Sequence, residues 1–136
     1  MHPWTDKPRR SAVILCVDDS PDVMECVKAF LETFGYRVLA ACSGREGLRL
    51  ASLQMIDVVI VDCSMPEMNG HEFAIEMNRL TPRAPIIMLS GSADIPTQVL
   101  KQFDAFVVKD CLSSQLLSVI AQLHGRERTS SQLFNA

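Results

Sequence analysis

The chain has 136 residues, of which 48% are hydrophobic and 21% are charged, a composition typical of a folded globular domain rather than of a disordered chain. The formal net charge is −3 and no stretch of clustered basic residues occurs, so there is no electrostatic reason to expect binding to nucleic acid. No apolar segment approaches the ~20 residues that a bilayer span requires, and residues 1–11 lack the apolar core of a signal peptide, so we expect one cytoplasmic domain without a membrane partner.

The amino-terminal part of the chain predicts an arm, a strand and a helix. Residues 1–11 contain prolines and basic residues without periodicity, which indicates a flexible arm. An apolar run at 13–17 predicts the first strand. Ser20 followed by Pro21 is typical of a helix start, and Gly35 predicts the end of that helix. Between them, apolar residues recur at the spacing of one buried helix face, namely Val23, Val27, Phe30 or Leu31, and Phe34.

The rest of the chain alternates strands with helices. Apolar runs predict four more strands, at 37–41, 55–61, 85–89 and 105–108. Capping residues and apolar periodicity predict four more helices, at 44–53, after a loop at 64–69, at 94–103 and at 112–124. Ser43 and Glu46 form a capping box that opens the first of these four helices. The helix at 94–103 has the weakest pattern, with Asp94 as its cap and Pro96 in its first turn.

The predicted strands are apolar throughout rather than at every second residue, as expected for strands that are buried on both faces. Five strands and five helices in strict alternation predict right-handed βαβ units and an open, doubly wound parallel sheet of the α/β class. We assign this domain to residues 12–124 and the polar residues 125–136 to a short carboxyl-terminal tail. Ligands of such sheets bind outside the carboxyl ends of the strands, and polar residues occur at those positions here.

Three carboxylates follow the predicted strands directly. Asp18 and Asp19 come after the first strand, and Asp62 comes after the third. Parallel strands bring these ends together, and three neighbouring carboxylates repel one another strongly unless a counter-ion is present. Mg²⁺ binds a few such oxygens and keeps its other positions for water and phosphate. The backbone carbonyl of Ser64 lies close enough in the chain to contribute a further ligand.

Two more polar residues stand at the ends of the fourth and fifth strands. Lys109 carries a mobile positive charge that suits a phosphate group or a carboxylate, and the Ser90 hydroxyl can donate to a phosphoryl oxygen. Together with a metal ion, these groups would stabilise the charge on a transferring phosphoryl group. We therefore expect Asp62 to act as a nucleophile that forms an aspartyl phosphate.

Five short motifs occur in order and at suitable spacing between about residue 12 and residue 124. They are Val17-Asp18-Asp19, Val61-Asp62, Met65-Pro66-Glu67-Met68-Asn69-Gly70, Leu89-Ser90-Gly91 and Val107-Val108-Lys109. In this combination the chain resembles the response-regulator receiver domain, which is the phosphoacceptor part of two-component signalling. The resemblance implies a flavodoxin-like sheet with the strand order 2-1-3-4-5.

The resemblance also implies what the acidic residues do. Asp62 would accept a phosphoryl group from a sensor histidine kinase, a histidine phosphotransfer protein or a small phosphodonor. Asp18, Asp19 and Asp62 would hold Mg²⁺ together with the backbone carbonyl of Ser64.

The same resemblance implies roles for residues on the last two strands. Ser90 and Lys109 would bind the phosphoryl group, and Phe106 lies at the position of the family's aromatic switch. Rotation of the Phe106 ring would accompany a shift of Ser90. These changes would alter how the surface of the fourth helix, fifth strand and fifth helix binds an output protein.

The chain departs from the family pattern close to Lys109. The family usually has a proline after this lysine, joined by a cis peptide bond, whereas Asp110 follows it here. A cis bond before a residue other than proline costs ~2.5–4 kcal/mol. The sequence therefore does not decide whether this bond is trans, nor whether a trans bond shifts Lys109 from its usual place. Gly91 replaces the alanine that is common after the serine. Ser64 and Ser92 are small, which favours access of water to the acceptor.

These observations favour a stand-alone phosphoacceptor that signals through protein contacts and is not a turnover enzyme. Met1 and the polar tail suggest a complete chain without a second domain. A receiver-shaped binding module that acts independently of phosphorylation is the alternative that Asp110 and Gly91 motivate. A third interpretation is an aspartate-nucleophile phosphohydrolase, but such enzymes place a second aspartate two residues beyond the nucleophile, where this chain has Ser64.

Overall fold

Five strands form the centre of the computed structural model, which describes residues 12–92 and 94–124. They pair in parallel in the order β2-β1-β3-β4-β5, which confirms the order that the resemblance implied. Every residue of β1, β3 and β4 is buried, as their continuously apolar sequences predicted, whereas β2 and β5 form the edges and are partly exposed. Their bounds are β1 (Val13–Val17), β2 (Arg37–Ala41), β3 (Val58–Asp62), β4 (Ile86–Ser90) and β5 (Ala105–Val108).

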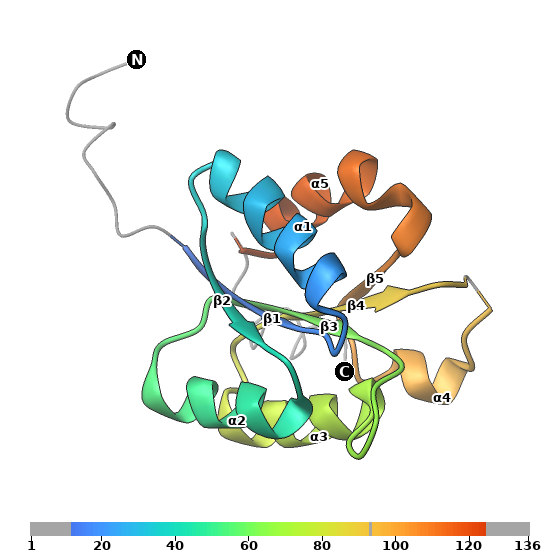
Figure 1. Ribbon diagram of the computed structural model, residues 1–136. Coiled ribbons are helices and arrows are strands. Elements are labelled where there is room, and N and C mark those ends of the chain that lie inside the picture. Colours follow the sequence, from blue (N-terminus) through green and yellow to red (C-terminus); the bar gives the residue numbers. More distant parts are fainter. Residues whose placement is uncertain (1–11, 93, 125–136) are drawn as a thin grey trace.

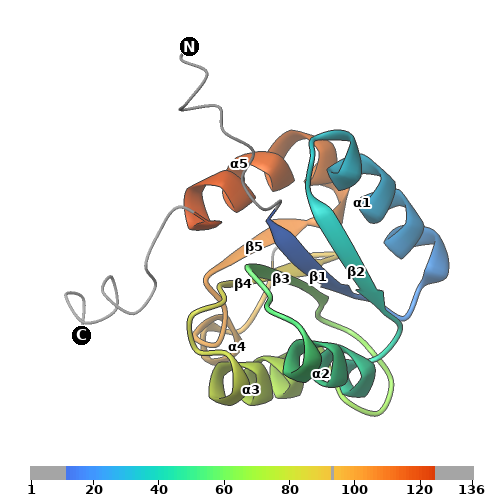
Figure 2. The same ribbon diagram turned by 90° about the vertical axis from the view of Figure 1, so that its left-hand side faces the viewer.

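Helices cover both faces of this sheet. α1 and α5 lie on one face, and α2, α3 and α4 lie on the other (Figures 1 and 2). The bounds are α1 (Pro21–Thr33), α2 (Gly44–Leu53), α3 (Gly70–Leu80), α4 (Thr97–Leu100) and α5 (Leu112–His124), with a 3₁₀ turn, η1 (Lys109–Cys111), before α5. Within the described ranges, no helix has both the length and the apolarity that a membrane span requires.

Successive residues of β1 serve two separate cores, because side chains alternate between the faces of a strand. Ile14 and Cys16 pack on the α1 and α5 side, in a cluster that includes Leu31 of α1. Leu15 and Val17 pack on the opposite side, in a cluster with α3 residues such as Phe73 and Met77. The sheet is therefore fixed from both faces, and its strand ends are held in place.

The starts of α1 and α2 follow the predicted capping residues. The Ser20 hydroxyl accepts a hydrogen bond from Val23 N at 3.4 Å, and Pro21 is the first helical residue. Ser43 Oγ accepts from Glu46 N at 3.1 Å. The Glu46 carboxylate accepts from Cys42 N rather than from the cap residue itself, so the expected capping box is only half formed.

The buried face of α1 is shorter than the periodicity predicted. Val27 and Leu31 are buried, but Phe34 is exposed. The Phe34 ring instead packs edge-on against Phe30, with ring centroids 5.3 Å apart. The prediction that Phe34 belongs to the buried stripe was therefore wrong, because the helix ends at Thr33 and Phe34 follows it as the cap residue.

The fourth helix differs most from expectation. The predicted helix at 94–103 is reduced to one turn, Thr97–Leu100, with Pro96 as its cap residue. A proline restricts the residue before it to extended conformations, so helix cannot continue back through Ile95 to Asp94. Asp94 therefore does not cap the helix, and its backbone N–H donates to Ser92 Oγ at 3.1 Å.

Candidate functional site

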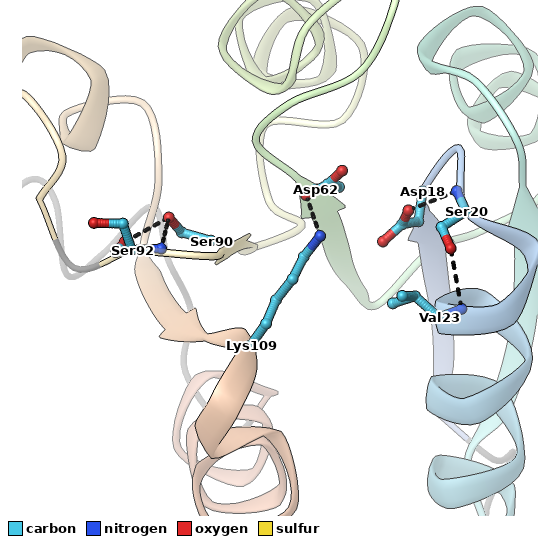
Figure 3. Close-up of polar contacts among 7 residues, drawn as sticks. All are labelled: Asp18, Ser20, Val23, Asp62, Ser90, Ser92 and Lys109. Carbon is cyan, nitrogen blue, oxygen red and sulfur yellow. Dashed lines mark hydrogen bonds and ion pairs between the residues drawn. The ribbon is translucent and has the colours of Figure 1, made fainter.

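The polar residues predicted for the site lie at the edge of the sheet where the strands end, called here the carboxyl edge. The register pairs Val17 of β1 with Val61 of β3, so Asp18 follows β1 next to Asp62, the last residue of β3. Ser90 is the last residue of β4, and Lys109 directly follows β5. The strand order thus brings residues from four distant parts of the chain to one place (Figure 3).

Three carboxylates form a tight acidic cluster at this edge. Asp18, Asp19 and Asp62 each contribute an oxygen, and these oxygens lie within 4.8 Å of one another. Asp18 and Asp62 are only 1% and 4% exposed, whereas Asp19 is exposed. Burial raises the pKa of Asp18, the Ser20 N–H lowers it, and the charges of Asp62 and Asp19 raise it further, so that the net shift is upward.

Asp18 has one satisfied and one unsatisfied oxygen. Its Oδ1 accepts a hydrogen bond from Ser20 N at 2.8 Å. Its Oδ2 is buried and has no hydrogen-bond partner within the described part of the chain. Buried acceptors without a partner are uncommon and call for an explanation. A divalent cation with oxygen ligands fits this set of donors, because it would occupy the unsatisfied oxygen and offset the repulsion among the carboxylates.

Lys109 forms an ion pair with the central carboxylate of the cluster. Its Nζ donates to Asp62 Oδ1 at 2.9 Å. Burial lowers the pKa of Lys109, but the hydrogen bond and the charge of Asp62 outweigh this effect and raise the pKa overall. The ammonium group is therefore firmly protonated and neutralises one of the three negative charges.

Ser90 points away from this cluster. Its hydroxyl donates to Ser92 O at 2.5 Å and accepts from Ser92 N at 3.1 Å. Figure 3 shows the Ser90 side chain turned toward Ser92 rather than toward Asp62. Ser90 is at the predicted position, but its hydroxyl donates to the backbone oxygen of Ser92 in the loop that follows β4.

The chain matches the model of the response regulator receiver domain over residues 14–121. The chain belongs to this family. It is 37% identical over 90 residues to the transcriptional regulatory protein GlrR of Escherichia coli K12, a match that covers 66% of this chain but only 20% of GlrR. The receiver therefore corresponds to about a fifth of that relative's length.

Solved receiver structures agree with the fold described above. Chemotaxis response regulator CheY4 of Vibrio cholerae is 32% identical, with a TM-score of 0.77, and the match covers 84% of this chain and 99% of CheY4. Response regulator TrrA of Thermotoga maritima, solved in complex with Mg²⁺-BeF, is 31% identical with a TM-score of 0.78. That match covers 82% of this chain and 98% of TrrA.

The structure also describes two further residues predicted for the receiver, Ser64 and Phe106. Ser64 is exposed in the loop after β3, two residues beyond Asp62. Phe106 is partly buried in β5. It pairs with Met88 of β4, and Met88 lies two residues before Ser90 on that strand.

Lys109 contacts the acidic cluster although Asp110, and not proline, follows it. No peptide bond within the described ranges is cis, so the Lys109–Asp110 bond is trans. The chain enters a 3₁₀ turn at Lys109, and the side chain still reaches Asp62. The peptide bond that the sequence left open is therefore trans.

Sequence reasoning missed what the β3–α3 loop contributes to the receiver site. A Cβ atom on Gly70 would lie 2.6 Å from the backbone oxygen of Asp62 and 2.9 Å from Cys63 Cα. Asn69 and Glu72 form a complete capping box at the start of α3. Asn69-Gly70 is a turn and helix-start signal in the sequence, and Asn69 does cap α3. The sequence did not show that Gly70 packs against the strand end that carries Asp62.

Proposed function

We propose that this receiver accepts a phosphoryl group on Asp62 from the phosphohistidine of a sensor histidine kinase or of a histidine phosphotransfer protein. The observation that carries the proposal is the position of the Asp62 carboxylate, which is nearly buried, paired with Lys109 and next to the unsatisfied oxygen of Asp18. In the transfer, an Asp62 oxygen forms a bond to phosphorus as the bond between phosphorus and the donor imidazole breaks.

We infer that Asp18, Asp19 and Asp62, with the backbone carbonyl of Ser64, hold Mg²⁺. The close set of carboxylate oxygens and the unsatisfied Oδ2 of Asp18 support this inference, as does the Mg²⁺-BeF bound to the related TrrA. When bound, Mg²⁺ offsets the negative charge of the carboxylates and of the phosphoryl oxygens.

Lys109 and Ser90 complete the proposed phosphoryl site. The Lys109 ammonium, which already bonds Asp62, turns to a phosphoryl oxygen and stabilises its charge. Ser90 exchanges its hydrogen bond to Ser92 for one to another phosphoryl oxygen. In this proposal, the movement of Ser90 and rotation of the Phe106 ring change the surface formed by α4, β5 and α5, which binds an output protein.

The proposal further describes a stand-alone receiver of the cytoplasm that catalyses its own phosphorylation and dephosphorylation. An antibody against the chain, applied to a lysate of the source cells, tests this point. A band at the mass of 136 residues supports it, and a larger protein contradicts it.

Incubation with acetyl phosphate and Mg²⁺, followed by intact-mass measurement, tests the acceptor. We expect one added phosphoryl group, which is lost in Asp62→Asn and in the presence of a chelator. Asp22→Asn is the matched control, because Asp22 is exposed in the first turn of α1, and it should be phosphorylated normally. An adduct that persists in Asp62→Asn would disprove the assignment.

A binding module that acts without phosphorylation is the second candidate. The hydrogen bonds that hold Ser90 to Ser92 favour it, together with Asp110 and Gly91 at positions where the family pattern differs. This candidate predicts no adduct and no binding of beryllofluoride, whereas the phosphoacceptor predicts both. It also predicts that Asp62→Asn binds the output protein as tightly as the original chain.

A further inference from the structure

Two adjacent hollows of about 320 and 360 Å³ lie between α2 and α3, which run side by side below the sheet in Figures 1 and 2. Glu76 of α3 lines both hollows, so they form one continuous groove, called here the α2–α3 groove. Its apolar lining includes Leu48 of α2 and Ile75 and Leu80 of α3. Leu80 is 46% exposed, so the groove offers apolar surface for contact with another molecule.

Arg45 lines this groove at a position that α2 does not favour for a cation. It lies in the first turn of the helix, where a positive charge opposes the helix dipole. Its side chain is exposed and forms no ion pair within the described residues, whereas Arg49, one turn later, pairs with Glu46 at 3.9 Å. The local structure therefore gives no reason for an arginine at this position.

Glu67 lines the same groove at a position that favours glycine. Its φ is 66°, in the left-handed region that residues other than glycine rarely adopt. Met68 N donates to Pro66 O at 2.7 Å and closes a tight turn around Glu67. The side chain is exposed, and its carboxylate has no hydrogen bond or ion pair within the described ranges. Residues that conflict with their local structure in this way are expected at functional surfaces.

We propose that the α2–α3 groove is the contact surface of a dimer of this chain, in which Arg45 of one copy pairs with Glu67 of the second copy. In a dimer with two-fold symmetry, each contact between two different residues occurs twice, once in each direction. The reciprocal pair, Glu67 of the first copy with Arg45 of the second, therefore forms as well. Leu80 of each copy adds apolar contact at the other end of the groove.

The charges of the groove favour a second copy over a partner that carries charge of one sign. Glu76 already pairs with Arg79 at 3.3 Å, and the Glu72 carboxylate accepts a backbone N–H at the start of α3. Arg45 and Glu67 are thus the charged lining residues whose side chains have no polar partner in the part of the chain that the structure describes. An acidic partner would pair with Arg45 alone and a basic partner with Glu67 alone, whereas a second copy pairs with both.

The groove is small, so the dimer should be weak. Helices of about ten residues measure ~15 Å and pack ~10 Å apart, so the joint outer face of α2 and α3 is much smaller than the ~800 Å² per partner of a standard stable interface. Exposed ion pairs also contribute little each, because water and salt screen them. We expect a dissociation constant of roughly 10–1000 μM.

Sedimentation equilibrium of the full chain, at protein concentrations up to ~1 mM, tests the proposal. The mean mass should rise from that of the monomer toward that of the dimer as the concentration increases. The dissociation constant should increase at high salt, because salt screens exposed charges. A monomer at every concentration would overturn the proposal. Association that continued beyond the dimer would also overturn it, because a two-fold contact is closed.

Charge reversal identifies the residues that pair. Arg45→Glu turns both attractive pairs into repulsive ones, so the dissociation constant should rise about tenfold. Glu67→Arg should have the same effect, and both side chains are exposed, so the fold should persist, which circular dichroism checks. The double variant exchanges the two charges and should dimerise within about threefold of the original chain. A double variant as weak as the single ones would disprove the pairing.

Lys101→Glu is the matched control for Arg45→Glu. Lys101 is exposed directly after α4 and does not line the groove. Its replacement changes the net charge by the same amount, so the dissociation constant should stay the same. An equal loss of dimer in both variants would mean that net charge or the α4 surface controls the association, and would overturn the assignment to the α2–α3 groove.

Discussion

The buried carboxylate of Asp18 lowers the stability of the metal-free fold. The carboxylate is buried, one of its oxygens lacks a hydrogen-bond partner within the described residues, and two other carboxylates lie close to it. Burial and the neighbouring charges of Asp62 and Asp19 raise its pKa despite the Ser20 N–H. Without a cation, this arrangement costs free energy that protonation of Asp18 or binding of a cation recovers.

Asp18→Asn should therefore stabilise the metal-free protein. The amide keeps the acceptor for Ser20 N and places a donor near the Asp62 and Asp19 carboxylates. We expect the free energy of unfolding in urea, with a chelator present, to rise by about 1–2 kcal/mol. The same variant should lose Mg²⁺ affinity, which titration calorimetry measures.

Asp19→Asn is the control for this prediction. Asp19 is exposed, so its replacement should change the free energy of unfolding by no more than ~0.5 kcal/mol. If Asp18→Asn proved less stable than the original chain, the unsatisfied oxygen would not be a source of strain.

The positions of the polar residues could be predicted from the sequence, but their hydrogen bonds could not. Asp62, Ser90 and Lys109 each end or follow an apolar run, and parallel strands place such ends together. The direction of the Ser90 hydroxyl depends on the backbone path of Ser92. Such loop geometry leaves no periodic signal in the sequence.

At the scale of elements, the β3–α3 connection determines where Asp62 sits. Gly70 is the first residue of α3, and a Cβ atom on it would point into the backbone of Asp62 and Cys63. Its N–H donates to Cys63 O at 3.3 Å. The helix start thus packs on the end of the strand without room for a side chain.

Gly70→Ala should disturb both the stability and the acceptor. The added Cβ would meet backbone atoms, which cannot rotate away, so β3 or α3 must shift. We expect the free energy of unfolding to fall by about 1–3 kcal/mol and phosphorylation by acetyl phosphate to slow. Urea unfolding and the time course of the intact mass measure the two effects.

Gly91→Ala is the matched control for the Gly70 variant. A Cβ atom on Gly91 would meet nothing within 4 Å, so stability should change by no more than ~0.5 kcal/mol. Equal losses in both variants would mean that the close approach at Gly70 does not matter.

Elements with a strong apolar or capping pattern were predicted better than the element with a weak one. The apolar strands and the capped helices α1 and α2 were expected within a few residues of their bounds. The α4 region was not, because its apolar pattern is weak. Pro96 disfavours helix in the residue before it, so the helix starts at Thr97, and it also ends at Leu100, three residues before the predicted end.

At the scale of the whole molecule, protonation, metal binding and folding are linked through the acidic cluster. The pKa of Asp18 is raised above its ordinary value of 3.8, so the folded metal-free protein binds this proton more tightly than the unfolded chain does. Between the two pKa values the folded state carries more protons, and its stability falls as pH rises. Lys109 has a pKa raised above 10.5, so it stays charged throughout the acidic range.

Mg²⁺ should reverse this pH dependence. The cation requires the deprotonated Asp18 carboxylate, so its stabilising effect is present above the folded pKa of Asp18 and is lost as pH falls through that value. At a concentration one hundred times its dissociation constant, a ligand of the folded state adds ~2.7 kcal/mol. We expect an increment of this size near neutral pH and a progressively smaller one on acidification.

Urea unfolding with and without Mg²⁺, at pH values between about 4 and 8, measures this increment directly. Asp18→Asn is the control, because it removes both the titrating group and a proposed ligand, and its stability should respond to Mg²⁺ weakly at every pH. An increment that stayed constant down to the lowest pH would mean that the cation binds without Asp18. The acidic cluster would then need a different explanation for its unsatisfied oxygen.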